Sequence, residues 1–272
     1  MLRSRILITG AARSGTTVLG RIIALSPGVI YLLEPFNRHI WAGIPHYYPY
    51  IGDSTSKDKC EFYAELIDRI IHCKNRDLSL QYTSDTGVRK IVKRIGINRL
   101  YLQYRFAQAR CLLSTPKGLL IKDPSAIFLS KFLADDYDFK VIFSVRHPAA
   151  IMVSRRNLGW SFDFDCWRDE SDLYFDLFKD VDDAMKNYKI DFVAEVAFQW
   201  LTQYRYVYEV SRCTDNIKII RHEDWCINPV PEFTDIYEWL DLDYNDRVER
   251  RIKALTSGEV TDRTSENLSL IH

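Results

Sequence analysis

The fold is decided by the stretch Ile6-Leu7-Ile8-Thr9-Gly10-Ala11-Ala12-Arg13-Ser14-Gly15-Thr16-Thr17. Its first four residues are apolar or β-branched, which predicts a short buried strand that stops at Gly10. From Thr16 to Leu25 apolar residues recur at helical spacing, and the pattern stops before Pro27. The chain is therefore expected to run from a strand through a glycine-containing loop into a helix.

This loop has the spacing of a phosphate-binding loop. Gly10 and Gly15 stand where the motif G-x-x-x-x-G-K-[ST] has its two glycines. Glycines allow tight turning, and the N-terminus of the following helix favours an anion. Thr16 replaces the lysine of ATP- and GTP-binding loops, and the positive charge lies at Arg13 instead. The expected ligand is therefore a different polyanion, with a ligand-free strand-to-helix turn as the alternative.

Further short apolar runs alternate with helical patterns along the chain. They are rich in β-branched residues, which is typical of parallel strands buried on both faces. We expect these strands at residues 29–33, 118–121, 140–145 and 217–220. We expect helices at residues 57–73, 149–157, 192–212 and 232–240. The alternation predicts an α/β fold with a central parallel sheet and helices on both of its faces.

Two stretches interrupt the alternation. Residues 38–57 are rich in aromatic side chains, and residues 159–191 mix aromatic side chains with many acidic ones. Insertions after strand ends tend to cover the ligand crevice of such a sheet, so we expect both to form lids or acceptor-site elements. Surface loops packed by their own aromatic side chains are the alternative. Because no internal repeat is found, residues 1–272 are expected to form a single domain.

A second anion site is predicted more than 100 residues beyond the first. Arg146 ends an expected strand, and Pro148 suits the first turn of the helix that follows. Ser154 lies about two turns along that helix. A strand-end guanidinium and a helix-borne hydroxyl can converge on one phosphate. A structural role for both residues is the alternative.

These motifs resemble those of the sulfotransferases that use 3′-phosphoadenylyl sulfate (PAPS). The family writes its 5′-phosphosulfate loop as [KR]-S-G-[ST]-[ST], and Arg13-Ser14-Gly15-Thr16-Thr17 matches it throughout. Its 3′-phosphate site pairs a strand-end arginine with a serine eight residues later, as Arg146 and Ser154 are paired here. The resemblance implies a P-loop-like three-layer sandwich, PAPS as the donor and PAP as the product. The arginine in the loop and a later Glu-Pro are typical of the carbohydrate and bacterial branch.

Other segments resemble the family more loosely. Lys122-Asp123-Pro124 is similar to a K-[DT]-P element, and Arg221-His222-Glu223-Asp224 is similar to its R-Y-E-D segment, with histidine in place of tyrosine. We interpret the latter segment as architectural. The family often closes over the nucleotide with an arginine-containing C-terminal loop. That resemblance makes Arg263 a candidate donor ligand, although the R-K-G triplet of some members is absent.

Sulfuryl transfer needs a proton acceptor and positive charge near the bridging oxygen of the donor. Glu34 ends the second expected strand, where α/β enzymes place functional groups, and is our candidate base. The rival bases are His39 and His46, and a purely structural ion pair between Glu34 and a loop arginine such as Arg13 is the alternative role. Arg13 and Lys122 are the candidates for stabilising charge.

Composition narrows the class of protein. Lysine plus arginine and aspartate plus glutamate both number 37, which argues against a protein that mainly coats nucleic acid or an anionic membrane. No apolar run approaches the ~20 residues of a membrane span. The six cysteines show no C-x-x-C spacing, so neither a metal site nor a disulfide framework is expected. These features predict a cytoplasmic protein that binds no metal.

The expected partner is a carbohydrate or another small or lipid-like molecule that accepts the sulfuryl group on a hydroxyl or an amine. Two other functions stay open on the sequence alone. One is a P-loop nucleotide kinase or NTPase, against which the missing lysine argues. The other is a non-catalytic nucleotide-binding protein of the same fold, which would keep both phosphate sites.

Overall fold

The computed structural model describes residues 4–38, 40–41, 43–72, 104–110 and 116–256. Its sheet has five strands in the order β2-β3-β1-β4-β5, and every neighbouring pair is parallel. The strands are β1 (Ser4–Thr9), β2 (Val29–Leu33), β3 (Gly118–Lys122), β4 (Phe139–Val145) and β5 (Ile217–Arg221). The predicted parallel sheet is confirmed, and the carboxyl ends of all five strands meet at one edge.

Helices follow the strands, as the sequence predicts. The longer ones are α1 (Thr16–Ile23), α2 (Lys57–Ile71), α5 (Ser130–Tyr137), α6 (Pro148–Leu158), α10 (Phe192–Val210), α12 (Pro229–Leu240) and α13 (Asp246–Thr256). The shorter ones are the 3-10 helix η1 (Pro124–Ile127), α7 (Asp165–Arg168), α8 (Ser171–Leu173), the π-helix η2 (Tyr174–Phe178), α9 (Lys179–Met185) and α11 (His222–Ile227). Local signals set several starts: Pro148 occupies the first turn of α6, and the Asp191 carboxylate accepts hydrogen bonds from the first turn of α10.

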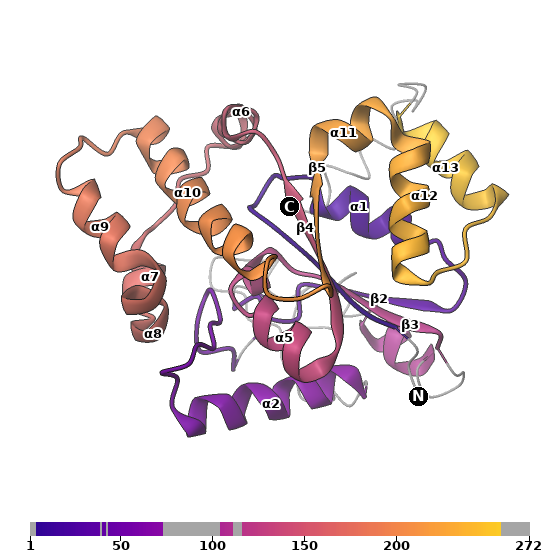
Figure 1. The fold of residues 1–272 in the computed structure, drawn as a ribbon, viewed down its shortest axis with the longest axis horizontal. Helices are drawn as coiled ribbons and strands as arrows, with labels where there is room; N and C mark the ends of the chain where they lie inside the picture. The colour runs from indigo at the N-terminus through magenta and orange to yellow at the C-terminus, as the bar shows by residue number, and fades with distance from the viewer. Residues whose placement is uncertain (1–3, 39, 42, 73–103, 111–115, 257–272) are drawn as a thin grey trace, which may run out of the picture.

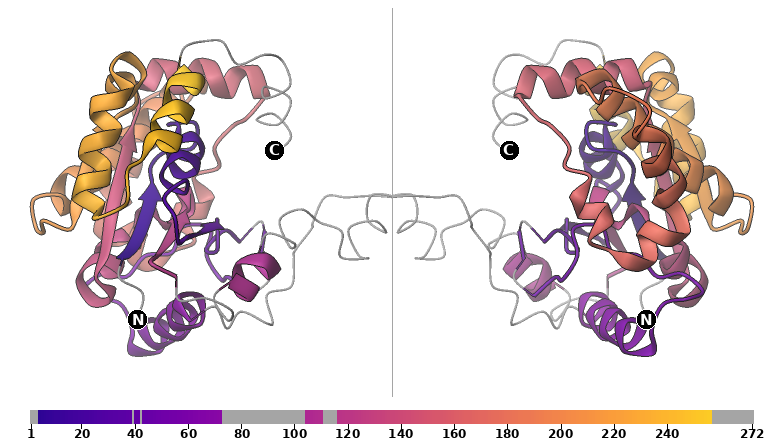
Figure 2. Two further views of the ribbon diagram at one scale, coloured as in Figure 1. Left: turned by 90° about the vertical axis from the view of Figure 1, so that its right-hand side faces the viewer. Right: turned by 90° about the vertical axis from the view of Figure 1, so that its left-hand side faces the viewer.

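The sheet separates two hydrophobic cores. Side chains of a strand point alternately to its two faces, so Phe139, Val141 and Phe143 of β4 enter one core and Ile142 enters the other. Helices α2, α5 and α10 cover the first core, whereas α1, α11, α12 and α13 cover the second (Figure 1). Figure 2 shows α2 and the pair α12 and α13 at opposite ends of the molecule, with the sheet between them. This is the predicted three-layer α/β sandwich.

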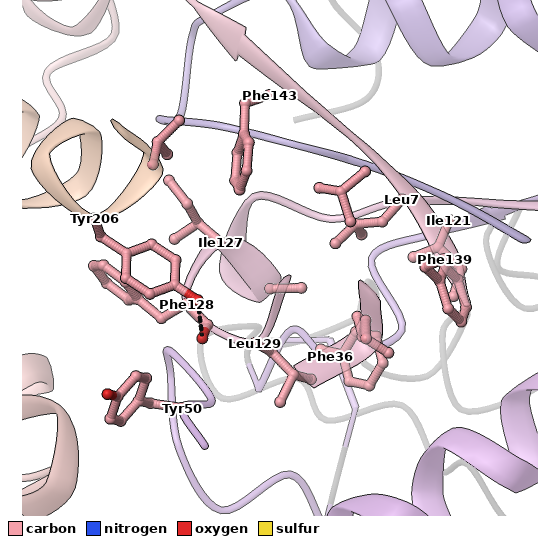
Figure 3. Close-up of a cluster of buried hydrophobic side chains, with 14 of the residues drawn as sticks. Leu7, Phe36, Tyr50, Ile121, Ile127, Phe128, Leu129, Phe139, Phe143 and Tyr206 are labelled. Atoms are coloured by element: carbon pink, nitrogen blue, oxygen red, sulfur yellow. Dashed lines mark hydrogen bonds between the residues drawn. The ribbon is translucent and has the colours of Figure 1, made fainter. Parts of the chain in front are cut away.

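The first core fixes the chain that follows β3. Ile127, Phe128 and Leu129 are fully buried there, next to Tyr206 of α10 (Figure 3). The hydroxyl of Tyr206 donates a hydrogen bond of 3.0 Å to the carbonyl oxygen of Phe128. This bond satisfies the polar end of a buried tyrosine and anchors α10 to the segment that leaves the carboxyl end of β3.

The aromatic stretch 38–57 packs inward. Trp41 is only 1% exposed, and Tyr50 is also buried. The ring of Tyr48 lies edge-on to Trp167 at 5.8 Å between ring centres, so this stretch is packed against the second insertion. Trp41 and Tyr50 therefore belong to the first core and Tyr48 packs against it, whereas Tyr47 lies beside Arg38.

The stretch 159–191, expected from the sequence to be a lid or an acceptor-site element, is largely helical. Its helices α7, α8, η2 and α9 enclose a cluster of aromatic rings around Trp167, including the rings of Phe162, Phe164 and Phe178. A polar network also ties it to the first insertion. Glu170, nearly fully buried, accepts from His46 Nε2 at 2.9 Å and pairs with Lys59 of α2. The two insertions therefore form one packed unit on α2.

Candidate active site

A pocket of about 430 Å³ opens at the carboxyl edge of the sheet. Every strand supplies it with residues from its carboxyl end: the glycine loop after β1, Glu34 after β2, Lys122 at the end of β3, Arg146 after β4 and His222 after β5. Its lining consists of Ala12, Arg13, Gly15, Thr16, Thr17, Val18, Leu33, Glu34, Lys122, Pro124, Arg146, Trp160 and His222. Parallel strands place ligand sites at this edge, so the sheet topology assembles the predicted residues.

Both glycines of the loop are required by close packing. Gly10 has a φ of +146°, and a Cβ atom there would lie 2.4 Å from the carbonyl oxygen of Ser144. Gly15 has a φ of +89°, and its Cβ would lie 2.4 Å from Cδ2 of His222. The hydroxyl of Ser144 also donates to the carbonyl oxygen of Ser14 at 2.6 Å. The loop is therefore pressed onto β4 on one side and onto α11 on the other.

We expect Gly10→Ala to lower the free energy of unfolding by about 2–5 kcal/mol, because a left-handed backbone and a backbone clash both oppose the new methyl group. Chemical denaturation measures the loss. The matched control is Gly159→Ala, since Gly159 also has a positive φ, +66°, but nothing lies within 4 Å of its Cβ position. The control is expected to lose only about 1–2 kcal/mol. Equal losses in the two variants would contradict the tight contact with Ser144.

The start of α1 is arranged for an anion. Gly15 is the N-cap and has no side chain to cap the helix, and the first turn contains no acidic residue. The first N–H groups of a helix lack partners within it and carry partial positive charge. Thr16 and Thr17 line the pocket at this point. Ser14, also predicted as a donor ligand, has a fully buried side chain and is not part of the pocket lining.

The two predicted phosphate sites lie side by side. Arg146 donates from its guanidinium to the carbonyl oxygen of Arg13 at 2.9 Å. Arg13 in turn donates from Nε to the hydroxyl of Ser154 at 2.9 Å, and its guanidinium lies 5.7 Å from the ring centre of Trp160. The pKa of Arg13 is lowered, first by burial and then by the positive charge of Arg146. An anion placed between these guanidinium groups would relieve that repulsion.

Glu34 and Lys122 form an ion pair at the floor of the pocket. Lys122 Nζ donates to Glu34 Oε1, and Asn37 Nδ2 donates to Glu34 Oε2 at 2.7 Å. The carbonyl oxygen of Glu34 accepts from the indole of Trp41 at 2.9 Å, and its backbone has a φ of +52°. The alternative role expected for Glu34 was an ion pair with a loop arginine such as Arg13, whereas its observed ion-pair partner is Lys122. Two of the three catalytic candidates, Glu34 and Lys122, are thus in direct contact.

Asp123 holds together the segments that carry Glu34 and Lys122. The sequence motif alone assigns no role to this residue. It is fully buried and accepts hydrogen bonds from the backbone N–H of Phe36 at 2.7 Å and of Ser125 at 2.9 Å. It therefore joins the turn after β2 to the turn after β3. Burial, and next the negative charge of Glu34, raise the pKa of Asp123 to about 7.

Two further candidates that the structure describes, His46 and Ser154, do not line the pocket. His46 bonds to the hydroxyl of Tyr63 at 3.0 Å and to Glu170, and it does not line the pocket. Ser154 reaches the pocket only through Arg13. His39 and Arg263 lie outside the described residues. Sequence reasoning did not assign Trp160 or His222 to the site, although both line it.

Among the described residues, no group of three or more histidine, cysteine, aspartate or glutamate side chains is placed to hold a metal ion. In the same part of the chain, no helix is both long and apolar enough to cross a membrane.

Comparison with known proteins decides the family. A sequence model described as the sulfotransferase family matches residues 5–246. The chain belongs to the sulfotransferase family. This membership supports sulfuryl transfer as the general activity and displaces the nucleotide-kinase alternative. A comparison with curated proteins found no match.

Solved structures of other sulfotransferases are similar to the chain. Sulfotransferase STF1 from Mycobacterium tuberculosis H37Rv is 17% identical, with 93% of this chain and 71% of that one covered and a TM-score of 0.47. Sulfotransferase STF9 from Mycobacterium avium is 17% identical, with 96% and 69% covered and a TM-score of 0.44. A sulfotransferase from Alicyclobacillus acidocaldarius is 14% identical, with 96% and 94% covered and a TM-score of 0.42.

Proposed function

We propose that this sulfotransferase uses PAPS as its donor and transfers the sulfuryl group to a hydroxyl or an amine of a small acceptor. One observation carries the proposal: a single pocket brings together the glycine loop, the strand-end Arg146 and the Glu34–Lys122 pair. Three cations, Arg13, Lys122 and Arg146, line it, which suits a donor with several negative charges. Its volume of about 430 Å³ is within the range of small-molecule sites.

The donor would be held at two points. The N–H groups at the start of α1, with Thr16 and Thr17, suit the 5′-phosphosulfate. Arg146 and Ser154 suit the 3′-phosphate. Arg13 connects the two points, because it bonds to Ser154 and its carbonyl oxygen bonds to Arg146. A bound polyanion would compensate the repelling positive charges of Arg13 and Arg146, which favours its binding between them.

Glu34 is the proposed base. Each of its carboxylate oxygens accepts one hydrogen bond, from Lys122 and from Asn37, so lone pairs remain for a proton from the acceptor. The acceptor oxygen or nitrogen would attack sulfur as the bond between sulfur and the phosphate oxygen breaks. The negative charge that appears on PAP is stabilised by Lys122 and Arg13. Glu34 is paired with Lys122 until the acceptor binds, and it then takes the proton that the acceptor loses.

The acceptor side of the pocket has both apolar and charged walls. Val18, Leu33 and Trp160 line it beside Glu34. Trp160 comes from the second insertion, 159–191, and is 39% exposed, and its ring lies 5.7 Å from the guanidinium of Arg13, so an aromatic surface borders the place where charge develops. A carbohydrate or a lipid-like metabolite fits this surface. In contrast, Trp41, Tyr48 and Tyr50 of the first insertion pack in or against the first core.

Activity with labelled PAPS and a panel of sugars, phenols, fatty alcohols and amines tests the proposal. Transfer of label to any acceptor class supports it and identifies the class. A chain that binds PAP tightly but transfers no label across the panel would instead be a non-catalytic nucleotide-binding protein of this fold.

PAP is expected to raise the melting temperature by about 5–10 °C at roughly 100 times its Kd, because a ligand that binds only the folded state stabilises it by mass action. AMP, ADP and ATP, which lack the 3′-phosphate, are expected to stabilise much less. Differential scanning fluorimetry makes the comparison. Equal shifts with ADP and PAP would contradict the 3′-phosphate site at Arg146.

A further inference from the structure

His222 forms part of the pocket wall next to the phosphate loop. It is the first residue of α11, directly after β5, and its ring packs edge-on against Trp225 with 4.6 Å between ring centres. The ring lies so close to Gly15 that a Cβ there would be 3.1 Å from Nε2 of His222. The imidazole is therefore fixed beside the N-terminus of α1, where the phosphate-binding N–H groups begin.

The charges around this imidazole come from three elements. Arg146 stands at the end of β4, and Arg13 lies on the loop that lines the same pocket. On α11 itself, Glu223 follows His222, and Sγ of Cys226 lies 3.6 Å from Nδ1. Glu223 is engaged by the backbone N–H of His147 at 2.9 Å. The immediate surroundings of the ring on the pocket side are thus cationic.

We propose that His222 is a proton-linked ligand of the donor nucleotide, so that the protein takes up a proton at His222 when PAP or PAPS fills the pocket. The proposal rests on the proposed function, since it concerns the same pocket and the same donor. The proton linkage depends on the histidine of Arg221-His222-Glu223-Asp224, because the similar family segment has tyrosine at this position.

The direction of the effect follows from the charges. Without a ligand, the pKa of His222 is lowered, by burial first and by Arg146 second, with Glu223 acting in the opposite direction. A nucleotide phosphate beside Arg146 compensates that positive charge and adds a negative partner, which raises the same pKa. The complex therefore binds more protons than the free protein. The contribution of His222 to the affinity therefore rises as the pH falls through the interval between the lowered pKa of the free protein and the raised pKa of the complex.

Calorimetric titration with PAP tests this directly. The dissociation constant is measured at about pH 8 and about pH 5.5, on either side of the ordinary titration of histidine. Proton uptake is measured at about pH 6.5 in two buffers of different ionisation enthalpy that contain no phosphate or sulfonate. The phosphates of PAP titrate near ~6 themselves, so the result is the difference between the parent chain and His222→Asn. We expect the parent to gain about tenfold more affinity than the variant on acidification, for a shift of about one pKa unit.

The matched control is His147→Asn. His147 adjoins Arg146 but is exposed, does not line the pocket, and caps α6 through a bond that asparagine also makes. This control is expected to keep the pH dependence of the parent chain. If its pH dependence is lost instead, the linked proton belongs to His147 and the inference is wrong.

His222→Tyr is the second variant. The similar R-Y-E-D segment of the family has tyrosine at this position, and tyrosine does not titrate in this pH range. The inference is overturned if either folded variant keeps the pH dependence of the parent chain. It is also overturned if the parent chain takes up no more protons on binding PAP than the variant does. If neither variant folds, the parent chain alone is measured. The inference is then overturned if the proton uptake is no greater than the uptake expected from the titration of PAP itself. A parent chain that fails to bind PAP at any pH contradicts the proposed function itself, which separates the two failures.

Discussion

The turnover number of Glu34→Gln is expected to fall by roughly 10²–10⁴-fold below that of the parent chain, the usual contribution of a positioned proton acceptor. Glutamine keeps the shape of the side chain and can still accept from Lys122 or Asn37, but it takes no proton from the acceptor. The affinity for PAP is expected to stay the same, since the donor contacts of the loop and of Arg146 are untouched. The loss therefore falls on kcat rather than on donor binding, which steady-state kinetics and a PAP titration separate.

The rival bases provide the controls for this result. His46 is occupied by Tyr63 and Glu170 outside the pocket, so His46→Ala should retain turnover within a few-fold. His39→Ala tests the other histidine of the first insertion. The base assignment is wrong if either histidine variant abolishes turnover while Glu34→Gln retains most of it.

The ion pair requires a further check, because removing the charge of Glu34 leaves the buried Lys122 without its partner. Denaturation of Glu34→Gln measures this cost. Lys122→Gln is the companion variant: it removes the same ion pair but leaves the proposed base in place. A stability loss shared by the two variants measures the ion pair, whereas a loss of kcat in Lys122→Gln measures the charge that Lys122 is proposed to supply to PAP.

Arg146→Ala is expected to weaken PAP binding by about 2–3 kcal/mol, or about 30- to 160-fold in Kd, because it removes a charge-assisted bond to a phosphate. The affinity for AMP, which lacks the 3′-phosphate, is expected to change much less. Isothermal titration of both nucleotides measures the two losses. The control Arg156→Ala removes an exposed arginine of the neighbouring α6 that does not line the pocket.

The comparison with AMP is decisive because Arg146 has two contacts to lose. It also donates to the carbonyl oxygen of Arg13 and so supports the loop that would hold the 5′-phosphate. Equal losses of affinity for AMP and PAP would mean that Arg146 acts through the loop. A loss confined to PAP assigns the 3′-phosphate to Arg146.

Much of this site follows from local sequence patterns. Residues 29–33 form a strand with the predicted bounds, and the residues that follow each predicted strand meet at the carboxyl edge of the sheet. Short β-branched runs fix the strands, and the glycine spacing fixes the loop. Because parallel strands end at the same edge, these local features already imply that Arg13, Glu34 and Arg146 converge.

Contacts between side chains of different strands could not be predicted from these local sequence patterns. Glu34 pairs with Lys122 because β3 lies between β2 and β1, and that strand order depends on contacts far apart in the sequence. The helices of residues 165–185 were also missed, since their stability comes from rings and ion pairs of several segments rather than from one apolar face. His222 was missed because only the tertiary structure brings α11 against Gly15.

A crystal structure of the chain with PAP tests most directly whether this pocket holds the donor. The account predicts the 5′-phosphate at the N–H groups that begin α1, and the 3′-phosphate within hydrogen-bonding distance of Arg146 and Ser154. Arg13 should then have left Ser154 to face the 5′-phosphate. PAP bound elsewhere on the protein, or bound here with its 3′-phosphate directed into solvent, would contradict the account.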